Sequence, residues 1–336
     1  MLPETVVPVV KVQGWRTELG FLASSHGERV TVLVMTYNHE RFIGEALDSA
    51  LLQETNFDYE ILISEDYSTD RTREIVQEYA RRDPRRIRLI LSDHNLRSNE
   101  IVTRGIREAL GEYIALLDGD DFWLDRHKLQ KQVDFLDTHP ECTVCFHQAI
   151  ARDERGERPD WSWTPANQKE FSTLEDICMG NFIATGSTMF RRAATGAPPG
   201  WYSSFFPITD WPLHVLNAEK GKIGYINEVM SIYRHHDGGA FSGLSQFQKQ
   251  DEIYHLYQRL DEVFEHRYER FIKAGIFEYF MDWADEHANR GEQDQAVACF
   301  KRGLTGWPLR LLAGVRKLAR IWLKLNVSRP QVRANP

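Results

Sequence analysis

The 336-residue sequence contains four cysteines, and no stretch approaches the roughly eighteen uninterrupted apolar residues of a membrane-spanning helix. Four cysteines in so long a chain exclude a disulfide scaffold, so a reducing cytoplasmic environment is the default expectation. Glu4 and Lys11 interrupt the apolar residues at the start, and no secretory signal peptide is expected there. Attachment to the surface of a membrane stays open.

Positive charge is also scarce. The chain has 41 Lys and Arg against 49 Asp and Glu, a net charge of −8, which argues against nucleic-acid binding through bulk positive charge. The charge is unevenly spread, because residues 301–336 contain nine Lys and Arg and no Asp or Glu. Residues 1–300 therefore carry a net charge of −17, with 32 Lys and Arg against 49 Asp and Glu.

The basic end has the pattern of an amphipathic helix over residues 309–325. Drawn as a helix, its apolar face holds Leu311, Leu312, Val315, Leu318, Ala319, Trp322 and Leu325. The opposite face holds Arg310, Arg316, Lys317, Arg320 and Lys324. Two interpretations follow. The helix lies on an anionic membrane surface, or it packs on the protein with its basic face in water.

Apolar, β-branched runs alternate with helical patterns through the first half of the chain. The predicted strands are 30–36, 59–64, 87–91, 113–117 and 143–149. The predicted helices between them are 40–52, 68–82, 99–110 and 126–137. This alternation predicts an α/β fold with a doubly wound, mostly parallel sheet, whose ligands bind at the carboxyl ends of the strands.

The later elements are shorter and end in helices. We expect a surface excursion at 151–170, then a helix at 173–179, a strand at 187–190, a helix from Asp210, and strands at 223–226 and 228–233. After Gly243 the apolar spacing is purely helical. The predicted organisation is an N-terminal extension (1–28), an α/β domain (29–240) and a helical region with the basic tail (241–336).

The loops after the predicted strands carry the polar residues that point to chemistry. They are TYN at 36–38, ED at 65–66, SDHN at 92–95 and DGDD at 118–121. Alternate carboxylates after a buried strand are suited to a hard divalent cation. A calcium EF-hand beginning at Asp118 is excluded, because Trp123 and Leu129 occupy the positions that require Gly and Glu. A solvated acidic turn is the structural alternative.

Other nucleotide and metal sites are disfavoured. The loop TYNHERFIG follows the first predicted strand, where a nicotinamide-binding domain would have G-x-G-x-x-G, and no P-loop is present. Cys142 and Cys145 lie on a predicted strand and point to opposite faces, which argues against zinc. What remains is recognition of a nucleotide diphosphate through a metal bridge.

The ordered motifs VTVLVMTYNHERFIGEALDSALLQ, YEILISEDYSTDRT and GEYIALLDGDDFW resemble those of family 2 glycosyltransferases, which have the GT-A fold. The resemblance covers about residues 29–240. It implies an inverting enzyme that uses a UDP-sugar and Mn²⁺ or Mg²⁺. It implies that Thr36, Tyr37, Asn38 and Asp66 form the base site, that Asp118 meets the ribose, and that Asp120 binds the metal. Asp121 belongs to the same loop.

The resemblance extends to two later motifs. In ITDWPLH, Asp210 is the candidate general base, with Thr209 where the family usually has Glu; an N-cap is the structural alternative for Asp210. In YRHHDGG, His236 would reach the metal or diphosphate, and Arg234 would steady the loop or counter phosphate charge. The structural alternative is stronger for His235.

The expected function is therefore metal-dependent transfer of a sugar from a nucleotide diphosphate to an acceptor hydroxyl, in cell-surface polysaccharide or glycan synthesis. The acceptor would be a glycan or a lipid-linked sugar, reached from the cytoplasm at the inner face of the membrane. No nucleic-acid partner is expected. The alternatives are a sugar-phosphate nucleotidylyltransferase, which should have a Gly-rich phosphate loop, and a non-catalytic docking protein, which the Thr209 departure favours.

Overall fold

The structure is a computed structural model that describes residues 9–12, 15–18, 28–306, 318, 320–322 and 324. The chain divides into two compact units, which are treated separately below. The sheet unit comprises the residues up to 174 together with 182–244, and the helical unit comprises 175–181 together with the residues from 245 onward.

Four parallel strands form the centre of the sheet unit, in the order β5-β4-β3-β6. They are β3 (Val30–Thr36), β4 (Tyr59–Glu65), β5 (Ile87–Ser92) and β6 (Tyr113–Asp118). The helices between and after them are α1 (Ile43–Leu51), α2 (Thr72–Arg82), α3 (Glu100–Glu108) and α4 (Lys128–Thr138). The predicted α/β alternation and mostly parallel sheet are confirmed.

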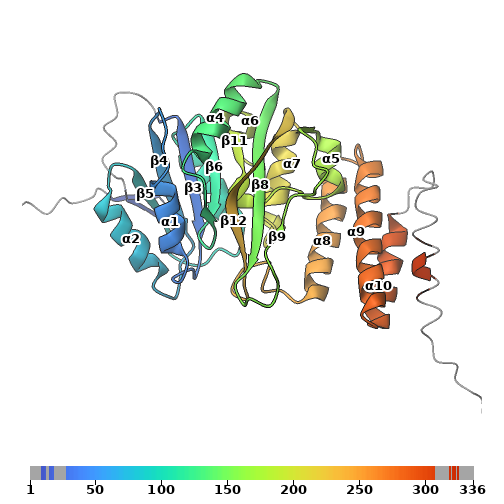
Figure 1. Ribbon diagram of the computed structural model, residues 1–336. Helices are drawn as coiled ribbons and strands as arrows, with labels where there is room; N and C mark the ends of the chain where they lie inside the picture. Colours follow the sequence, from blue (N-terminus) through green and yellow to red (C-terminus); the bar gives the residue numbers. More distant parts are fainter. Residues whose placement is uncertain are drawn as a thin grey trace, which may run out of the picture. The chain divides into compact units, whose positions relative to one another are not determined.

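The other half of the sheet is mixed. The short strand β11 (Met189–Arg191) lies antiparallel between β6 and β8 (Cys142–Asp153), and β8 pairs in parallel with β12 (Lys222–His235). Figure 1 shows β8 and β12 side by side. The prediction of two strands at 223–226 and 228–233 was wrong, because β12 continues through register shifts between Ile226 and Ser231. The minor strands are β7 (Phe122–Trp123), β9 (Trp161–Ser162) and β10 (Phe171–Ser172).

The N-terminal segment differs from the expected extension. Two strands, β1 (Val9–Val12) and β2 (Trp15–Glu18), pair with each other, and β2 pairs antiparallel with β5. They therefore extend the sheet by two strands beyond β5.

The core explains why the central strands are such continuous apolar runs. Every residue of β3, β4 and β5 is buried, as expected for parallel strands that are covered on both faces. Helix α1 buries Ile43, Ala46, Leu47 and Ala50, which recur at helical spacing on one face. This packing fixes the ends of the strands, and so it fixes the loops that follow them.

Short elements occupy the stretch between β10 and β12. They are α5 (Leu174–Met179), the 3-10 turn η1 (Thr185–Ser187), α6 (Arg192–Thr195), the 3-10 helix η2 (Gly200–Phe205) and α7 (Asp210–Ala218). The sequence predicted a strand at 187–190; the structure has the strand at Met189–Arg191, and Ser187 is the last residue of η1.

Three helices form most of the helical unit: α8 (Gln246–Val263), α9 (Glu269–Asn289) and α10 (Gln293–Thr305). Ser245 caps α8, because its hydroxyl accepts from the Gln248 backbone N–H while the Gln248 side chain accepts from the Ser245 N–H. Within the described ranges, no helix has both the length and the apolar character that crossing a membrane requires.

Most of the predicted amphipathic helix at 309–325 lies outside the described residues. Among the residues that are described, Leu318 and Ile321 are buried and Trp322 is exposed. Lys324 pairs with Asp285 of α9 at 2.6 Å, and Arg320 pairs with the same carboxylate at 3.3 Å. These contacts connect the described part of the stretch to α9.

Candidate active site

The carboxyl ends of β3, β4 and β6 lie next to one another and bring the predicted polar loops together. The Asp66 N–H donates to the Thr36 carbonyl at 3.0 Å, and the Gly119 N–H donates to the Met35 carbonyl at 2.8 Å. These bonds continue the ladders past the strand ends. The first, second and fourth strand-end loops therefore share one rim, as the sequence predicts.

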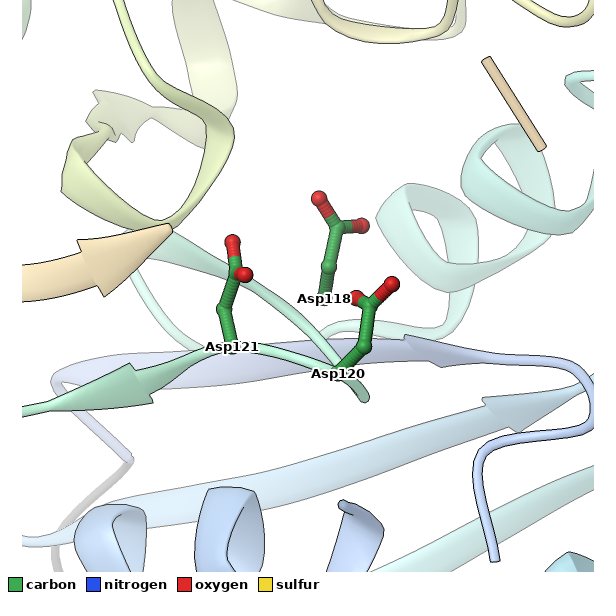
Figure 2. A group of neighbouring side chains, drawn as sticks. All are labelled: Asp118, Asp120 and Asp121. Carbon is green, nitrogen blue, oxygen red and sulfur yellow. The ribbon is translucent and has the colours of Figure 1, made fainter. Parts of the chain in front are cut away.

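Three aspartates gather on the loop after β6. Asp118, Asp120 and Asp121 each offer a carboxylate oxygen, and these oxygens all lie within 4.8 Å of one another. Figure 2 shows the three side chains on the same side of the loop. Asp118 and Asp120 are partly exposed, whereas Asp121 is buried. This is the one group of three or more His, Cys, Asp and Glu residues in the described chain with metal-ligand spacing.

Two histidines approach Asp120. The Nε2 atom of His236 lies 2.9 Å from Asp120 Oδ2, and the Nε2 atom of His39 lies 3.4 Å from the same oxygen. Burial acts to raise the pKa of Asp120, but the charge of His39 and the hydrogen bond and charge of His236 outweigh it, so this pKa is lowered. Asp120 is therefore held as a carboxylate.

The other two aspartates have the opposite tendency. Burial, followed by the charges of Asp120 and Asp210, raises the pKa of Asp118 well above its ordinary value, although a hydrogen bond from Thr185 opposes the rise. Burial and the charges of Asp120 and Asp118 likewise raise the pKa of Asp121. Like charges placed this close disfavour full ionisation unless a cation joins them.

The loop can take this shape only with glycine at its second position. A Cβ atom at Gly119 would lie 2.6 Å from Thr36 Oγ1 and 2.8 Å from His39 Nδ1. A methyl group there would push the loop away from β3. Gly119 thereby sets the approach of Asp120 to His39.

Arg234 holds the loop from the side of β12. Its Nη1 donates to the Asp120 carbonyl at 2.7 Å, and its backbone N–H donates to Asp121 Oδ1 at 2.8 Å. The guanidinium also bonds Glu154 at 3.0 Å and pairs with Glu45. Its carbon lies 4.4 Å from the Phe122 ring centroid and 5.1 Å from that of Phe42. With these protein partners, Arg234 steadies the loop.

The loops expected to hold the base are joined by their own hydrogen bonds. Asn38, with a positive φ of 55°, accepts from the Thr69 N–H at 2.8 Å, and its own N–H donates to Ser68 Oγ at 2.9 Å. Tyr37, beside it, is 37% exposed. Thr36 is buried, and its hydroxyl lies 3.3 Å from His39 Nδ1. Asn38 thus sets the spacing between the two loops.

Asp66 and Asp70 differ in environment. Asp70 caps the start of α2, accepting from the N–H groups of Thr72 at 2.9 Å and Glu40 at 3.0 Å. Asp66 is buried and accepts from the Leu96 N–H at 3.0 Å. Burial raises the pKa of Asp66 to about 6, the charge of Glu65 adds to the rise, and the bond from Leu96 limits it.

Asp210 is the first residue of α7, and Thr209 is the N-cap. Its charge contributes to the raised pKa values of Asp118 and of the buried Tyr202. The charge of Asp210 therefore acts on the loop after β6, as expected of a base that works beside the metal and the donor.

The loop before Asp210 is held by buried hydrogen bonds. The Tyr202 hydroxyl donates to the Thr209 carbonyl at 2.9 Å. The Nδ2 atom of Asn99 donates to the carbonyls of Tyr202 at 3.1 Å and Ile208 at 3.0 Å. Asn99 thus connects the start of α3 to both ends of this loop.

Sequence analysis did not single out four residues of this region: His39, Thr185, Tyr202 and Tyr233. His39 lies in the quoted TYNHE motif, so its place beside a strand end was the available signal. The other three reach the site through loops and a strand far along the chain. Cys142 and Cys145, the disfavoured zinc pair, are both buried in β8.

The donor set fits a hard divalent cation. Carboxylate oxygens are its preferred ligands, the mutual repulsion of the three aspartates is what a cation relieves, and His236 offers a nitrogen next to Asp120.

The family model for glycosyl transferase family 2 matches residues 31–195, which include the loops with Thr36, Asp66 and the three aspartates. Over this range the chain is similar to glycosyl transferase family 2. The matched range ends before Asp210, Arg234 and His236.

Relatives in bacteria agree with this family. The Mycobacterium tuberculosis protein Rv1520 is 39% identical over 212 residues, 62% of this chain. The matched stretch spans 60% of that relative's length. Bacillus subtilis TuaG, a glycosyltransferase whose name refers to teichuronic acid biosynthesis, is 34% identical over 173 residues, 50% of this chain and 64% of TuaG.

Solved structures show the GT-A fold. S. aureus TarS 1–349 in complex with UDP-GlcNAc has a TM-score of 0.61 at 18% identity and covers 88% of each chain. The mannosyltransferase PcManGT of Pyrobaculum calidifontis, in complex with GDP-Man and Mn²⁺, has a TM-score of 0.54 at 18% identity and covers 90% of this chain and 85% of that one. The predicted fold class is confirmed.

Proposed function

We propose that this protein is an inverting glycosyltransferase that moves a sugar from a nucleotide diphosphate, UDP in the first instance, to an acceptor hydroxyl. The observation that carries the proposal is the group of carboxylates after β6, with oxygens within 4.8 Å of one another. The family domain and the relatives support glycosyl transfer as the chemistry.

The metal would be Mn²⁺ or Mg²⁺, held by Asp120 and His236 with the donor diphosphate. When bound, it would neutralise charge on the departing nucleotide, so that no protein acid is needed there. Asp118 would contact the ribose, and Asp121 and Arg234 would fix the loop. The contacts of Arg234 with Asp120, Glu154 and Glu45 favour this supporting role over direct contact with phosphate.

The nucleotide base would lie over the first two strand-end loops. The Asp66 carboxylate would accept the imide N–H of uracil, and Thr36, Tyr37 and Asn38 would frame the ring from the other loop. Asn38 uses its side-chain oxygen on the Thr69 N–H, so its contribution to the base would be through its position in the loop.

Asp210 would act as the general base. It would take the proton from the acceptor hydroxyl while that oxygen forms a bond to the anomeric carbon and the bond to the nucleotide diphosphate breaks. The transition state would resemble an oxocarbenium ion, as in glycoside hydrolysis. Attack opposite the leaving group inverts the anomeric centre, so an α-linked donor gives a β-glycoside.

The acceptor would belong to cell-surface polysaccharide or glycan synthesis, a setting that TuaG's name supports. We also propose that the enzyme acts in the cytoplasm, at the inner face of the membrane. Co-sedimentation with anionic vesicles tests it. Salt-sensitive binding that is lost on truncation after Pro308 would support membrane contact at 309–325. Failure to bind, with loss of stability on truncation, would place this stretch in the helical unit.

The deciding experiment measures nucleotide release from UDP-sugars and GDP-sugars with Mn²⁺, with Mg²⁺ and with EDTA. We expect metal-dependent release of UDP from one or more UDP-sugars. Pyrophosphate release from a nucleoside triphosphate and a sugar phosphate would indicate a nucleotidylyltransferase instead. Donor binding without turnover, at every acceptor tried, would indicate a docking protein.

A further inference from the structure

A pair of aromatic rings lies beside the carboxylate loop. The rings of Trp163 and Tyr233 have centroids 4.8 Å apart and an interplanar angle of 54°. Burial, followed by the charges of the three loop aspartates and Asp210, raises the pKa of Tyr233 well above its ordinary value. The backbone places Tyr233 beside this loop, because the preceding Ile232 pairs with Phe122 and the following Arg234 donates its N–H to Asp121.

One ring comes from β12, and the other comes from the residue that directly follows β9. Tyr233 lies in β12, where it pairs with Ala151 of β8, and Trp161 of β9 pairs with the same Ala151 from the other side. The Trp163 N–H donates to the Ala149 carbonyl at 3.0 Å, and the Glu154 N–H donates to the His235 carbonyl at 3.1 Å. The hairpin formed by β8 and β9 is thus connected to β12 by backbone hydrogen bonds.

The neighbouring Trp161 provides a contrast. Its ring packs against Arg158, whose guanidinium carbon is 4.9 Å from the ring centroid. The centroid of the His235 ring lies 6.2 Å from that of Trp161. Trp163 and Tyr233 instead contact each other at the end of β12 that carries Arg234 and leads to His236. Both retain partial exposure to solvent. Trp161 packs against Arg158 and His235, whereas Trp163 packs against Tyr233, the neighbour in sequence of the Arg234 that bonds Asp121.

We propose that Trp163 and Tyr233 form the acceptor subsite and that the acceptor is a pyranose ring stacked against them. This inference rests on the proposed glycosyl transfer. The face of an aromatic ring is electron-rich and attracts the weakly positive C–H groups of one face of a pyranose, while the sugar hydroxyls at its edge stay free to bond. An open-chain polyol presents no such flat apolar face.

The subsite accounts for specificity as well as affinity. A pyranose held on these rings places its edge hydroxyls toward Asp210, whose charge Tyr233 already feels. Only a hydroxyl at that edge would lose its proton to the base. The orientation of the stacked ring would therefore select the linkage.

The test uses the full chain and three variants. Trp163→Phe keeps an aromatic face, Trp163→Leu keeps apolar bulk without one, and Trp161→Leu is the matched control. Nucleotide release with Mn²⁺ is measured without acceptor, with methyl pyranosides of glucose, galactose and mannose, and with ribitol. Circular dichroism and the melting temperature confirm that each variant folds.

We expect at least one methyl pyranoside to stimulate release more than ribitol does. Trp163→Leu should raise the acceptor KM by about tenfold, corresponding to the loss of one aromatic contact, while Trp163→Phe and Trp161→Leu stay near wild type. Acceptor-independent release of the nucleotide should be the same in the wild-type protein and in Trp161→Leu, because Trp161 belongs to neither the donor site nor the proposed subsite.

Two results would overturn the subsite: an acceptor KM unchanged by Trp163→Leu, or equal stimulation by ribitol and the pyranosides. A wild-type protein that releases no nucleotide from any donor would instead contradict the proposed transfer. Saturation-transfer NMR with the methyl pyranosides separates the two failures, because sugar contact with Trp163 is measured there without turnover. Loss of that signal in Trp163→Leu supports the subsite, and its persistence contradicts it.

Discussion

Each unit of this protein holds a cluster of polar side chains, and the two clusters differ in how their charges and hydrogen bonds are matched. In the helical unit, Gln250 Nε2 lies 2.9 Å from His287 Nε2, and His287 Nδ1 lies 2.5 Å from Glu292. The Cys299 thiol donates to Gln250 Oε1 at 3.2 Å. These partners complement one another across α8, α9 and α10, so the cluster needs nothing from outside.

In the sheet unit the cluster is mismatched. Three carboxylates lie together on the loop after β6, and the pKa values of Asp118 and Asp121 are raised because burial and like charges oppose ionisation. A fold that served stability alone would place an amide or a cation in this loop. The comparison indicates that repulsion between like charges, more than burial of polar groups, distinguishes the functional cluster from the structural one.

The largest effect is expected for Asp120→Asn. The variant should fold normally but lose metal-dependent nucleotide release by about 10³-fold, because a bound metal stabilises the departing charge by several kcal/mol. Turnover at a series of Mn²⁺ concentrations measures the loss. Near wild-type turnover with an unchanged Mn²⁺ requirement would contradict the assignment of Asp120.

Asp210→Asn should lower kcat by about 10²-fold or more and leave donor affinity nearly unchanged, since a general base acts in the transition state. Turnover and calorimetric titration of the donor, made on the same preparation, give the two quantities. If donor affinity collapses while kcat is spared, Asp210 belongs to the donor site and the base lies elsewhere.

A smaller effect is expected from pH. The pKa of Asp66 is raised to about 6, and in the proposed base site its ionised form would be the stronger acceptor for the imide N–H of uracil. UDP affinity should therefore be constant above this pKa and fall by about tenfold per pH unit below it. Calorimetry between acidic and neutral pH measures the slope. In the control, Asp66→Asn, binding is weaker and this slope disappears; an unchanged slope would assign it to another group.

The helical cluster supplies the structural counterpart. His287→Ala leaves the buried Gln250 amide and the Glu292 carboxylate without their partner, so the free energy of unfolding should fall by about 1–3 kcal/mol. Nucleotide release per folded molecule should be unchanged. Denaturant unfolding and the release assay test both statements. Lost turnover in a folded His287→Ala protein would contradict a purely structural role.

The smallest effect is expected for Asp70→Ala. Asp70 accepts one backbone N–H from Thr72, the first residue of α2, and one from Glu40 in the loop before α1, and loss of capping bonds of this kind costs about 1 kcal/mol. Donor KM should stay at the wild-type value, in contrast to Asp66 variants four residues away. Thermal unfolding measures the loss of stability, and donor kinetics measure the KM. A raised donor KM would place Asp70 in the nucleotide site.

The rim of the sheet could be predicted from the sequence because its causes are local. The strand β3 is a nearly continuous run of apolar, β-branched residues, a pattern typical of a strand that is covered on both faces of the sheet. The carboxyl ends of such parallel strands lie at a common edge. The common edge is why the sequence could predict that Thr36, Asp66 and Asp118 lie near one another.

The remaining parts depend on contacts that no local pattern encodes. The continuity of β12 through its register shifts is set by pairing with β8. The partners of Arg234, namely Asp120, Glu154 and Glu45, come from three separate stretches of chain. His39 approaches Asp120 because Gly119 lets the loop pass close to β3. Roles for Asp66 and Asp210 in binding and transfer stay predictions.

The distance along the chain between the aspartate loop and its supports has a consequence for synthesis. His236 is 116 positions after Asp120, and Arg234 is 113 after Asp121. At a translation rate of 5–20 residues per second, the ribosome needs roughly 6–23 s to add that stretch. During this interval the nascent chain holds the carboxylates without the residues that order them. A partly made chain would therefore be unable to capture a nucleotide sugar before β12 is in place.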